Sequence, residues 1–246
     1  MSTHTVFELR QYTLCPGQRE RLVELFEREF VEPQEALGMG LPGQFRDLDD
    51  PDRFIWLRSF PDMATRAAAL AAFYDGPVWR AHREAANATM LDSDDVLLLR
   101  PTQPFALGRV HRPSPGERAP AGLLSATICP VPPTEIAALA RSFDTQVRPV
   151  LERLGAPVLA QFVTEPARNT YPRLPVREGE SVFVWFAAFA DAATQARVQA
   201  AAAVDPAASA WLQRLDAVPE TLRLAPTPRS LLRGTPASAT PTGEHA

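Results

Sequence analysis

Two stretches of the chain align without a gap: "LGMGLPGQF", residues 37–45, and "LGAPVLAQF", residues 154–162. Each stretch follows an amphipathic helical pattern and leads into a strand-like segment. The glycines that they share, Gly38 and Gly155, are therefore predicted to end a helix in the left-handed conformation. The similarity continues in "IWLRSFPDMATRA" (residues 55–67) and "VWFAAFADAATQA" (residues 184–196), which indicates an internal duplication.

The first stretch also contains the spacing G-x-G-x-x-G, at Gly38, Gly40 and Gly43. In a dinucleotide-binding fingerprint a strand precedes the glycines and a helix follows them. Here the order is reversed, and the second copy keeps only Gly155. We therefore interpret the glycines as a helix-to-strand turn.

Each copy has the pattern strand, helix, strand, strand, helix, strand, which is the ferredoxin-like plan of an α+β fold. We expect an N-terminal repeat at 5–101, a proline-rich linker at 102–120, a C-terminal repeat at 121–232 and a disordered tail at 233–246. The helices of such a repeat cover one face of its sheet and leave the other bare. We expect the two βαββαβ repeats to pack sheet to sheet within one chain.

Three segments carry a family resemblance. "FELRQYTLCPGQ" (7–18) and "FIWLRSFPDMATRAAALAAFYDGPVWRAH" (54–82) resemble strands and a helix of NIPSNAP proteins, and "NTYPRLPVREGESVFVWF" (169–186) is similar to a hairpin of two-repeat bacterial members. The resemblance implies the dimeric α/β-barrel superfamily, in which two ferredoxin-like sheets pack face to face with helices outside. Relatives there include small cofactorless monooxygenases, lyases, isomerases and haem-handling enzymes.

The composition limits the classes of partner that we expect for this protein. The net charge is −4 and all 25 cationic side chains are arginines, so neither nucleic acid nor an anionic membrane is favoured, and lysine chemistry is excluded. No apolar run is long enough to span a bilayer, and the start has no signal-peptide core. With two cysteines we expect a cytoplasmic protein, with a homo-oligomer of the two-repeat chain left open.

His82 is the first candidate for chemistry. It shares one helical stripe with Trp79 and is expected to face the sheet. A neutral imidazole there could act as a general base or bind haem iron. The alternative is a histidine at the edge of the core that bonds to a backbone carbonyl.

Arg10, Tyr12, Trp56 and Arg58 form the second candidate group, because each pair shares one face of its strand. The arginines could hold a carboxylate or an enolate, and Tyr12 could donate a proton. The alternative is a buried structural network with Glu8. We add Gln44 and Trp79 to the expected substrate contacts.

The hairpin of the second copy is longer than that of the first, and it contains Tyr171 and Arg173, which we also expect to contact the substrate. The segment 169–178 is a candidate lid for the other half's pocket, or else a solvated hairpin. Cys15 and Cys129 fall at matching positions, which favours a structural role. H-x-x-x-H and C-x-x-C patterns are absent, so we expect no metal and no built-in cofactor.

These observations predict a small-molecule-binding protein with a pocket between the sheet and the helices of the N-terminal repeat. It could be a cofactorless enzyme of the monooxygenase, isomerase or lyase type, with His82 and Tyr12 as catalytic residues. The alternatives are a non-catalytic ligand-binding or protein-interaction module and, less favoured, haem binding through His82.

Overall fold

The computed structural model describes residues 3–105, 111–119 and 121–234. The first half contains β1 (Val6–Leu14), α1 (Arg19–Leu25), a π-helix (Phe26–Phe30), α2 (Val31–Ala36), β2 (Gly40–Asp47), β3 (Arg53–Phe60), α3 (Met63–Tyr74), α4 (Pro77–Asn87) and β4 (Met90–Pro101). The second contains β5 (Leu123–Pro130), α5 (Ile136–Gln146), α6 (Arg148–Arg153), β6 (Val158–Thr164), β7 (Val182–Phe189), α7 (Ala192–Val204), α8 (Pro206–Leu212) and β8 (Glu220–Pro226).

The eight strands form one closed antiparallel barrel in the order β1-β3-β2-β8-β5-β7-β6-β4. Each half contributes strands in the ferredoxin-like order, β4-β1-β3-β2 and β8-β5-β7-β6. The expected α+β fold is therefore confirmed, and the structure adds two hydrogen-bonded seams, β2–β8 and β4–β6. These seams pair the edge strands that two separate sheets would leave open.

The bare faces of the two sheets line the barrel. Phe7 and Leu9 of β1 point inward and pack with Phe162 and Phe186 from the second half. Glu8 and Arg10, which alternate with them, point outward. The two halves consequently share one apolar core.

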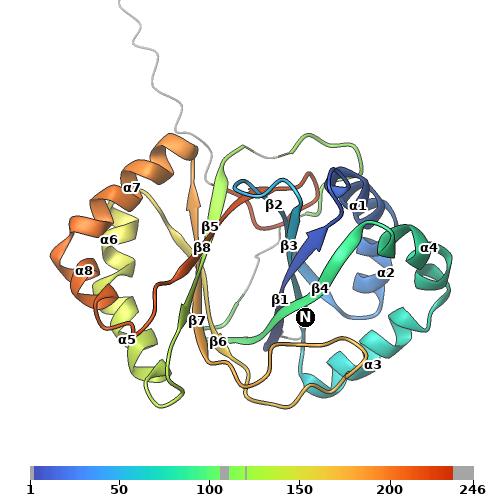
Figure 1. The fold of residues 1–246 in the computed structure, drawn as a ribbon, viewed down its shortest axis with the longest axis horizontal. Helices are drawn as coiled ribbons and strands as arrows, with labels where there is room; N and C mark the ends of the chain where they lie inside the picture. Colours follow the sequence, from blue (N-terminus) through green and yellow to red (C-terminus); the bar gives the residue numbers. More distant parts are fainter. Residues whose placement is uncertain (1–2, 106–110, 120, 235–246) are drawn as a thin grey trace, which may run out of the picture.

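The helices of each half cover the outside of its own strands, so the barrel lies between two helical layers (Figure 1). Under α1–α4 the outward face of β1 and β3 carries an aromatic and polar layer, whereas Phe183 and Trp185 of β7 pack against α5 and Trp211 in the second half. The space between sheet and helices in each half is where the candidate site lies.

Gly38 and Gly155 have φ of +82° and +93°, as expected for helix-ending glycines. The helix expected before Gly38 is divided into α1, a π-helix and α2. Pro33 in α2 has no amide hydrogen and cannot donate to a carbonyl of the preceding turn. The side-chain amide of Gln34 donates to the carbonyl of Phe30 at 3.0 Å. The next long helix is interrupted at Val147, between α5 and α6, and Pro149 lies in the first turn of α6.

The repeat limits given above stay a proposal; β4 ends at Pro101 and β5 begins at Leu123. Residues 106–110 and 120 of the expected linker and 235–246 of the expected tail lie outside the described residues. Within the described ranges, none of the helices is both long and apolar enough to traverse a bilayer.

Candidate functional site

The predicted group on β1 and β3 is brought together by strand register. Arg10 lies opposite Trp56, and Glu8 lies opposite Arg58. Because all four face outward, their side chains meet beneath α3, with Tyr12 one pleat further along β1. The guanidinium of Arg10 lies over the ring of Trp56 at 5.6 Å, and that of Arg58 lies over the same ring at 5.1 Å.

Glu8 is the centre of this cluster. Its carboxylate accepts from Arg10 Nη1 at 2.9 Å, Arg58 Nη2 at 2.6 Å and Arg66 Nε of α3 at 2.7 Å, and all four side chains are buried. Burial alone would raise the pKa of Glu8, but the charges of Arg58, Arg10 and Arg66 outweigh it and hold that pKa well below its ordinary value. The alternative of a buried network with Glu8 is therefore present in the structure.

Tyr12 belongs to the same network, since Arg10 Nε donates to its hydroxyl oxygen at 3.0 Å. Burial raises the pKa of Tyr12 above its ordinary value despite the opposing charge of Arg10, so the phenol is neutral. A neutral phenol could donate a proton, but its position is fixed by the arginine.

Little space is left beside this network. The cavity there has a volume of about 30 Å³ and is lined by aromatic side chains, among them Trp56, Trp79 and Tyr74. That volume is the size of a water site, since a water's share of liquid volume is about 30 Å³. The first half thus fills its own sheet–helix space.

Two predicted residues lie away from the cluster. His82 of α4 is 31% exposed, places Nε2 3.3 Å from a carboxylate oxygen of Glu29 and has its ring 6.2 Å from that of Phe30. Gln44 of β2 is buried, and its amide donates to the backbone carbonyl of Leu41 at 3.3 Å. Neither side chain has a contact with the Glu8 carboxylate among the hydrogen bonds of the described residues.

The long hairpin between β6 and β7 crosses to the first half and lies against α3 (Figure 1). Asn169 Oδ1 accepts from Arg66 Nη1 at 3.0 Å, and the ring of Tyr171 stacks on that of Tyr74 at 6.2 Å. Arg173 instead pairs with Asp75 at 2.8 Å on the surface. The hairpin therefore covers the first half's cluster, and its role as a lid stays a prediction.

The second half has the same site with different side chains. Trp185 matches Trp56, and strand register then places Ser125, Thr127 and Ala187 where the first half has Glu8, Arg10 and Arg58. On the helices, the shared N-caps Asp62 and Asp191 align α3 with α7. The positions of Arg66 and Tyr74 then correspond to Gln195 and Ala203.

The strand register also shows that Cys129 does not correspond to Cys15. Cys129 lies opposite Phe183 as Tyr12 lies opposite Phe54, so Cys129 takes the place of Tyr12 and not of Cys15. The sequence alignment pairs Cys129 with Cys15 instead, because it compares residue identities and not the register of the strands. Burial raises the pKa of the Cys129 thiol to about 12, which leaves it protonated.

Where the second half has smaller side chains, it has a cavity of about 270 Å³. Its wall is formed by β5, β7 and β8 on one side and α6, α7 and α8 on the other. The lining residues are Ser125, Thr127, Val147, Leu151, Trp185, Ala187, Phe189, Val198, Gln199, Ala202, Ala203, Ala208, Leu212, Pro219 and Thr221. The signal in the sequence is the small residue Ala187 at the position that matches Arg58.

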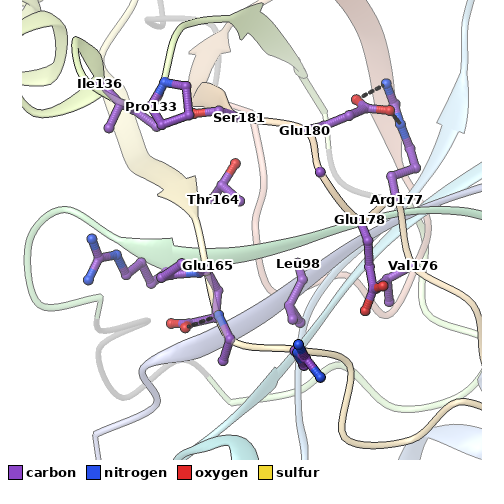
Figure 2. A pocket seen from close by; sticks show the side chains of 15 residues that line it. Leu98, Pro133, Ile136, Thr164, Glu165, Val176, Arg177, Glu178, Glu180 and Ser181 are labelled. Atoms are coloured by element: carbon purple, nitrogen blue, oxygen red, sulfur yellow. Dashed lines mark hydrogen bonds and ion pairs between the residues drawn. The ribbon is translucent and has the colours of Figure 1, made fainter.

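A larger cleft of about 420 Å³ lies at the base of the long hairpin, beside the β4–β6 seam (Figure 2). Its acidic side chains are already engaged: Glu180 pairs with Arg177, Glu165 accepts from the amide of Ala167, and Glu178 accepts from that of Asn169. These contacts hold the hairpin in shape, and we assign the cleft a structural role. Among the described residues, no group of three or more His, Cys, Asp or Glu side chains is arranged to hold a metal ion.

Solved structures that match over nearly the whole length of this chain have the same fold. An anthrone oxidase-like protein has 12% identity and a TM-score of 0.63, with 92% of each chain covered. Two provisionally named monooxygenases follow: one from Fusobacterium nucleatum (8% identity, TM-score 0.56, 92% and 94% covered) and one from Lactobacillus acidophilus (12%, 0.54, 91% and 94%). None of the curated proteins matches the chain significantly.

The family comparison concerns the first half. The NIPSNAP family profile matches residues 7–104, the part that contains β1–β4 and the Glu8 cluster. The dimeric α/β-barrel fold, which the whole-length neighbours share, is here built within one chain. Residues 7–104 are thus a NIPSNAP domain, as the sequence resemblance predicted.

Proposed function

We propose that this protein binds a small, uncharged and largely apolar molecule in the cavity between the sheet and helices of the second half. The observation that carries the proposal is the cavity of about 270 Å³ with an apolar wall. The polar side chains in its lining are three hydroxyl residues and one amide, Ser125, Thr127, Thr221 and Gln199. A charged ligand would lose its hydration there without gaining a counter-charge, so a neutral ligand is favoured.

The contrast between the halves supports this location. The sequence predicts the pocket in the N-terminal repeat, but there the structure has buried ion pairs and a cavity of about 30 Å³. In the second half the same positions carry Ser125, Thr127 and Ala187, whose shorter side chains free the volume. The first half supplies a rigid, filled partner for a second half that can hold a ligand.

Oxidation of such a ligand is a second candidate function. It is favoured by the whole-length likeness to proteins named as monooxygenases or anthrone oxidase-like. The lining residues include no imidazole and no carboxylate that could act as a general base, so binding is the primary proposal. Formation of an oxygenated product from a bound aromatic compound in air would support the second candidate.

The test of the proposal is titration with N-phenyl-1-naphthylamine, a neutral probe that fluoresces in apolar surroundings. We expect saturable enhancement with the wild-type protein and its loss in Ala187→Leu, because Ala187 is a buried floor residue of the cavity. Ala200→Leu, on an exposed position of α7, is the matched control and should bind as the wild type does. Circular dichroism checks folding; equal binding by both variants would contradict the proposal.

A further inference from the structure

We infer that the ligand of the second-half cavity contains a flat, uncharged aromatic ring, and that this ring stacks on the indole of Trp185. The inference rests on the proposed function and names the class of its ligand. It is carried by a comparison of Trp185 with Trp56, which occupies the matching position in the first half.

The two tryptophans have the same packing on one side. The ring of Phe26 lies 4.8 Å from that of Trp56, and the ring of Phe143 lies 4.8 Å from that of Trp185. Extended back without a gap, the alignment of the two copies also pairs Phe26 with Phe143. The two indole rings therefore differ in what covers the remainder of each ring.

In the first half, cations cover that remainder. The guanidiniums of Arg10 and Arg58 lie over the ring of Trp56 at 5.6 and 5.1 Å, and Trp56 is 2% exposed. Glu8 accepts hydrogen bonds from both arginines and balances their charge. This arrangement leaves no free indole surface in the first half.

In the second half the covering side chains are missing. Thr127 and Ala187 take the positions of Arg10 and Arg58, and both are too short to extend over the indole ring as a guanidinium does. Among the described residues, none of the guanidiniums lies over Trp185. Trp185, Thr127 and Ala187 all line the cavity, and Trp185 is 7% exposed. The part of the ring that cations cover in the first half therefore adjoins the cavity.

The surroundings decide what can stack there. An indole face attracts both cations and aromatic rings. A cation would be buried without a counter-charge, because Ser125 replaces Glu8 and the lining residues include neither aspartate nor glutamate. A neutral aromatic ring meets no such cost, so it is the favoured partner of Trp185.

The opposite wall suits a flat ring as well. Leu151 of α6 and Val198 of α7 line the cavity from the helical side, whereas Trp185 lines it from the sheet. A ring between them would have the indole on one face and aliphatic side chains on the other. The volume of about 270 Å³ is close to the lower end for ligand pockets, roughly 300 Å³, which favours a compact ring system.

The experiment compares two neutral probes with one carbon skeleton, 2-naphthylmethanol and decahydro-2-naphthylmethanol, each competing with N-phenyl-1-naphthylamine on the full chain. The ratio of their affinities is measured in the wild type and in Trp185→Leu, so that their different solubilities in water cancel. An aromatic pair corresponds to roughly a two- to tenfold difference in affinity. We expect the preference for the naphthyl probe to fall by about that factor in Trp185→Leu. Phe73→Leu, which removes a buried aromatic ring of the first half, is the matched control and should keep the preference.

A second measurement needs no substitution. Trp185 also packs against Trp211 at 5.8 Å, so its replacement can disturb the second half, and circular dichroism checks the variant first. In the wild type, nuclear Overhauser effects between the naphthyl protons and the assigned indole protons report the contact directly. We expect them at Trp185 and not at Trp56.

The outcomes separate the two proposals. If the fluorophore and both probes fail to bind, the proposed function fails and the inference fails with it. If the fluorophore binds but the naphthyl probe does not, or if folded Trp185→Leu has the affinity ratio of the wild type, the stacking inference is wrong and the apolar pocket stands. Where the variant does not fold or binds neither probe, the wild-type contacts decide. Naphthyl protons close to Trp185 support the inference, and protons close only to aliphatic side chains such as Leu151 overturn it.

Discussion

Glu8 is the residue on which the first half depends most. One buried carboxylate neutralises part of the charge of three buried guanidiniums, those of Arg10, Arg58 and Arg66. Buried ion pairs do not necessarily add net stability, because both partners lose hydration. Removing one partner is much worse, since it leaves the others buried and unpaired.

We therefore expect Glu8→Gln to lower the free energy of unfolding by about 3–5 kcal/mol. Urea unfolding followed by circular dichroism measures this change. Glu20→Gln, which breaks a surface pair with Arg46, is the control and should change stability little. A Glu8→Gln protein as stable as the wild type would show that the guanidiniums are hydrated in solution.

The same residue predicts a pH dependence. The folded-state pKa of Glu8 lies well below its ordinary value of 4.5, so the unfolded chain takes up the proton first. The stabilisation is complete above pH 4.5 and is lost progressively as the pH falls below it. The stability difference between wild type and Glu8→Gln should accordingly shrink from pH 7 to pH 3, as measured by urea unfolding at each pH; a constant difference would contradict the assignment.

At the scale of elements, the hairpin between β6 and β7 does most to join distant parts of the chain. It leaves the second half, crosses to α3 and places Tyr171 in the aromatic core of the first half. There Asn169 Oδ1 accepts a hydrogen bond from Arg66 Nη1, so the hairpin supplies a partner for a guanidinium of the cluster. An element of one half thus finishes the packing of the other.

Truncation of the hairpin's anchor tests this. Tyr171→Ala should lower the free energy of unfolding by about 3 kcal/mol, because a buried aromatic ring is lost. Arg173→Ala, two residues away, should have a much smaller effect, because its contacts, with Asp75 at 2.8 Å and over the ring of Tyr171 at 5.6 Å, are made by an exposed side chain. Denaturant unfolding of both variants gives the comparison; similar small effects would mean that the hairpin only rests on the surface.

At the scale of the molecule, barrel closure makes the halves interdependent. The seams β2–β8 and β4–β6 pair every sheet edge, and the interior mixes residues such as Phe7 and Phe186 from both halves. The first half alone would expose an apolar sheet face and two strand edges to water. Such a surface favours self-association.

We expect residues 1–105, expressed alone, to form a dimer or to aggregate, whereas the full chain unfolds in a single transition. Light scattering after size-exclusion chromatography and calorimetry measure these properties. A stable, folded monomer of residues 1–105 would show that the barrel interior contributes little to its stability.

Much of the architecture could be predicted from the sequence. Helix-ending glycines, alternating strands and the duplicated segments are local patterns, and they fix which residues face the sheet exterior. Strand alternation alone is therefore enough to group Arg10 with Tyr12 and Trp56 with Arg58. Arg66 could not be added to this group in the same way, because it approaches Glu8 from a helix. A helical pattern predicts the face on which a residue lies, but not which residues of the sheet its side chain contacts.

Only the tertiary structure decided where a cavity is left. A cavity is the volume left over when side chains from several elements meet, and here it depends on Ser125, Ala187 and Ala203 being small at the same place. The correspondence of Cys129 with Tyr12 is likewise set by pairing between strands. The sequence by itself determined the duplicated fold, because local periodicity specifies faces; the three-dimensional packing determined which half is filled and which is open, because free volume is a sum over distant residues.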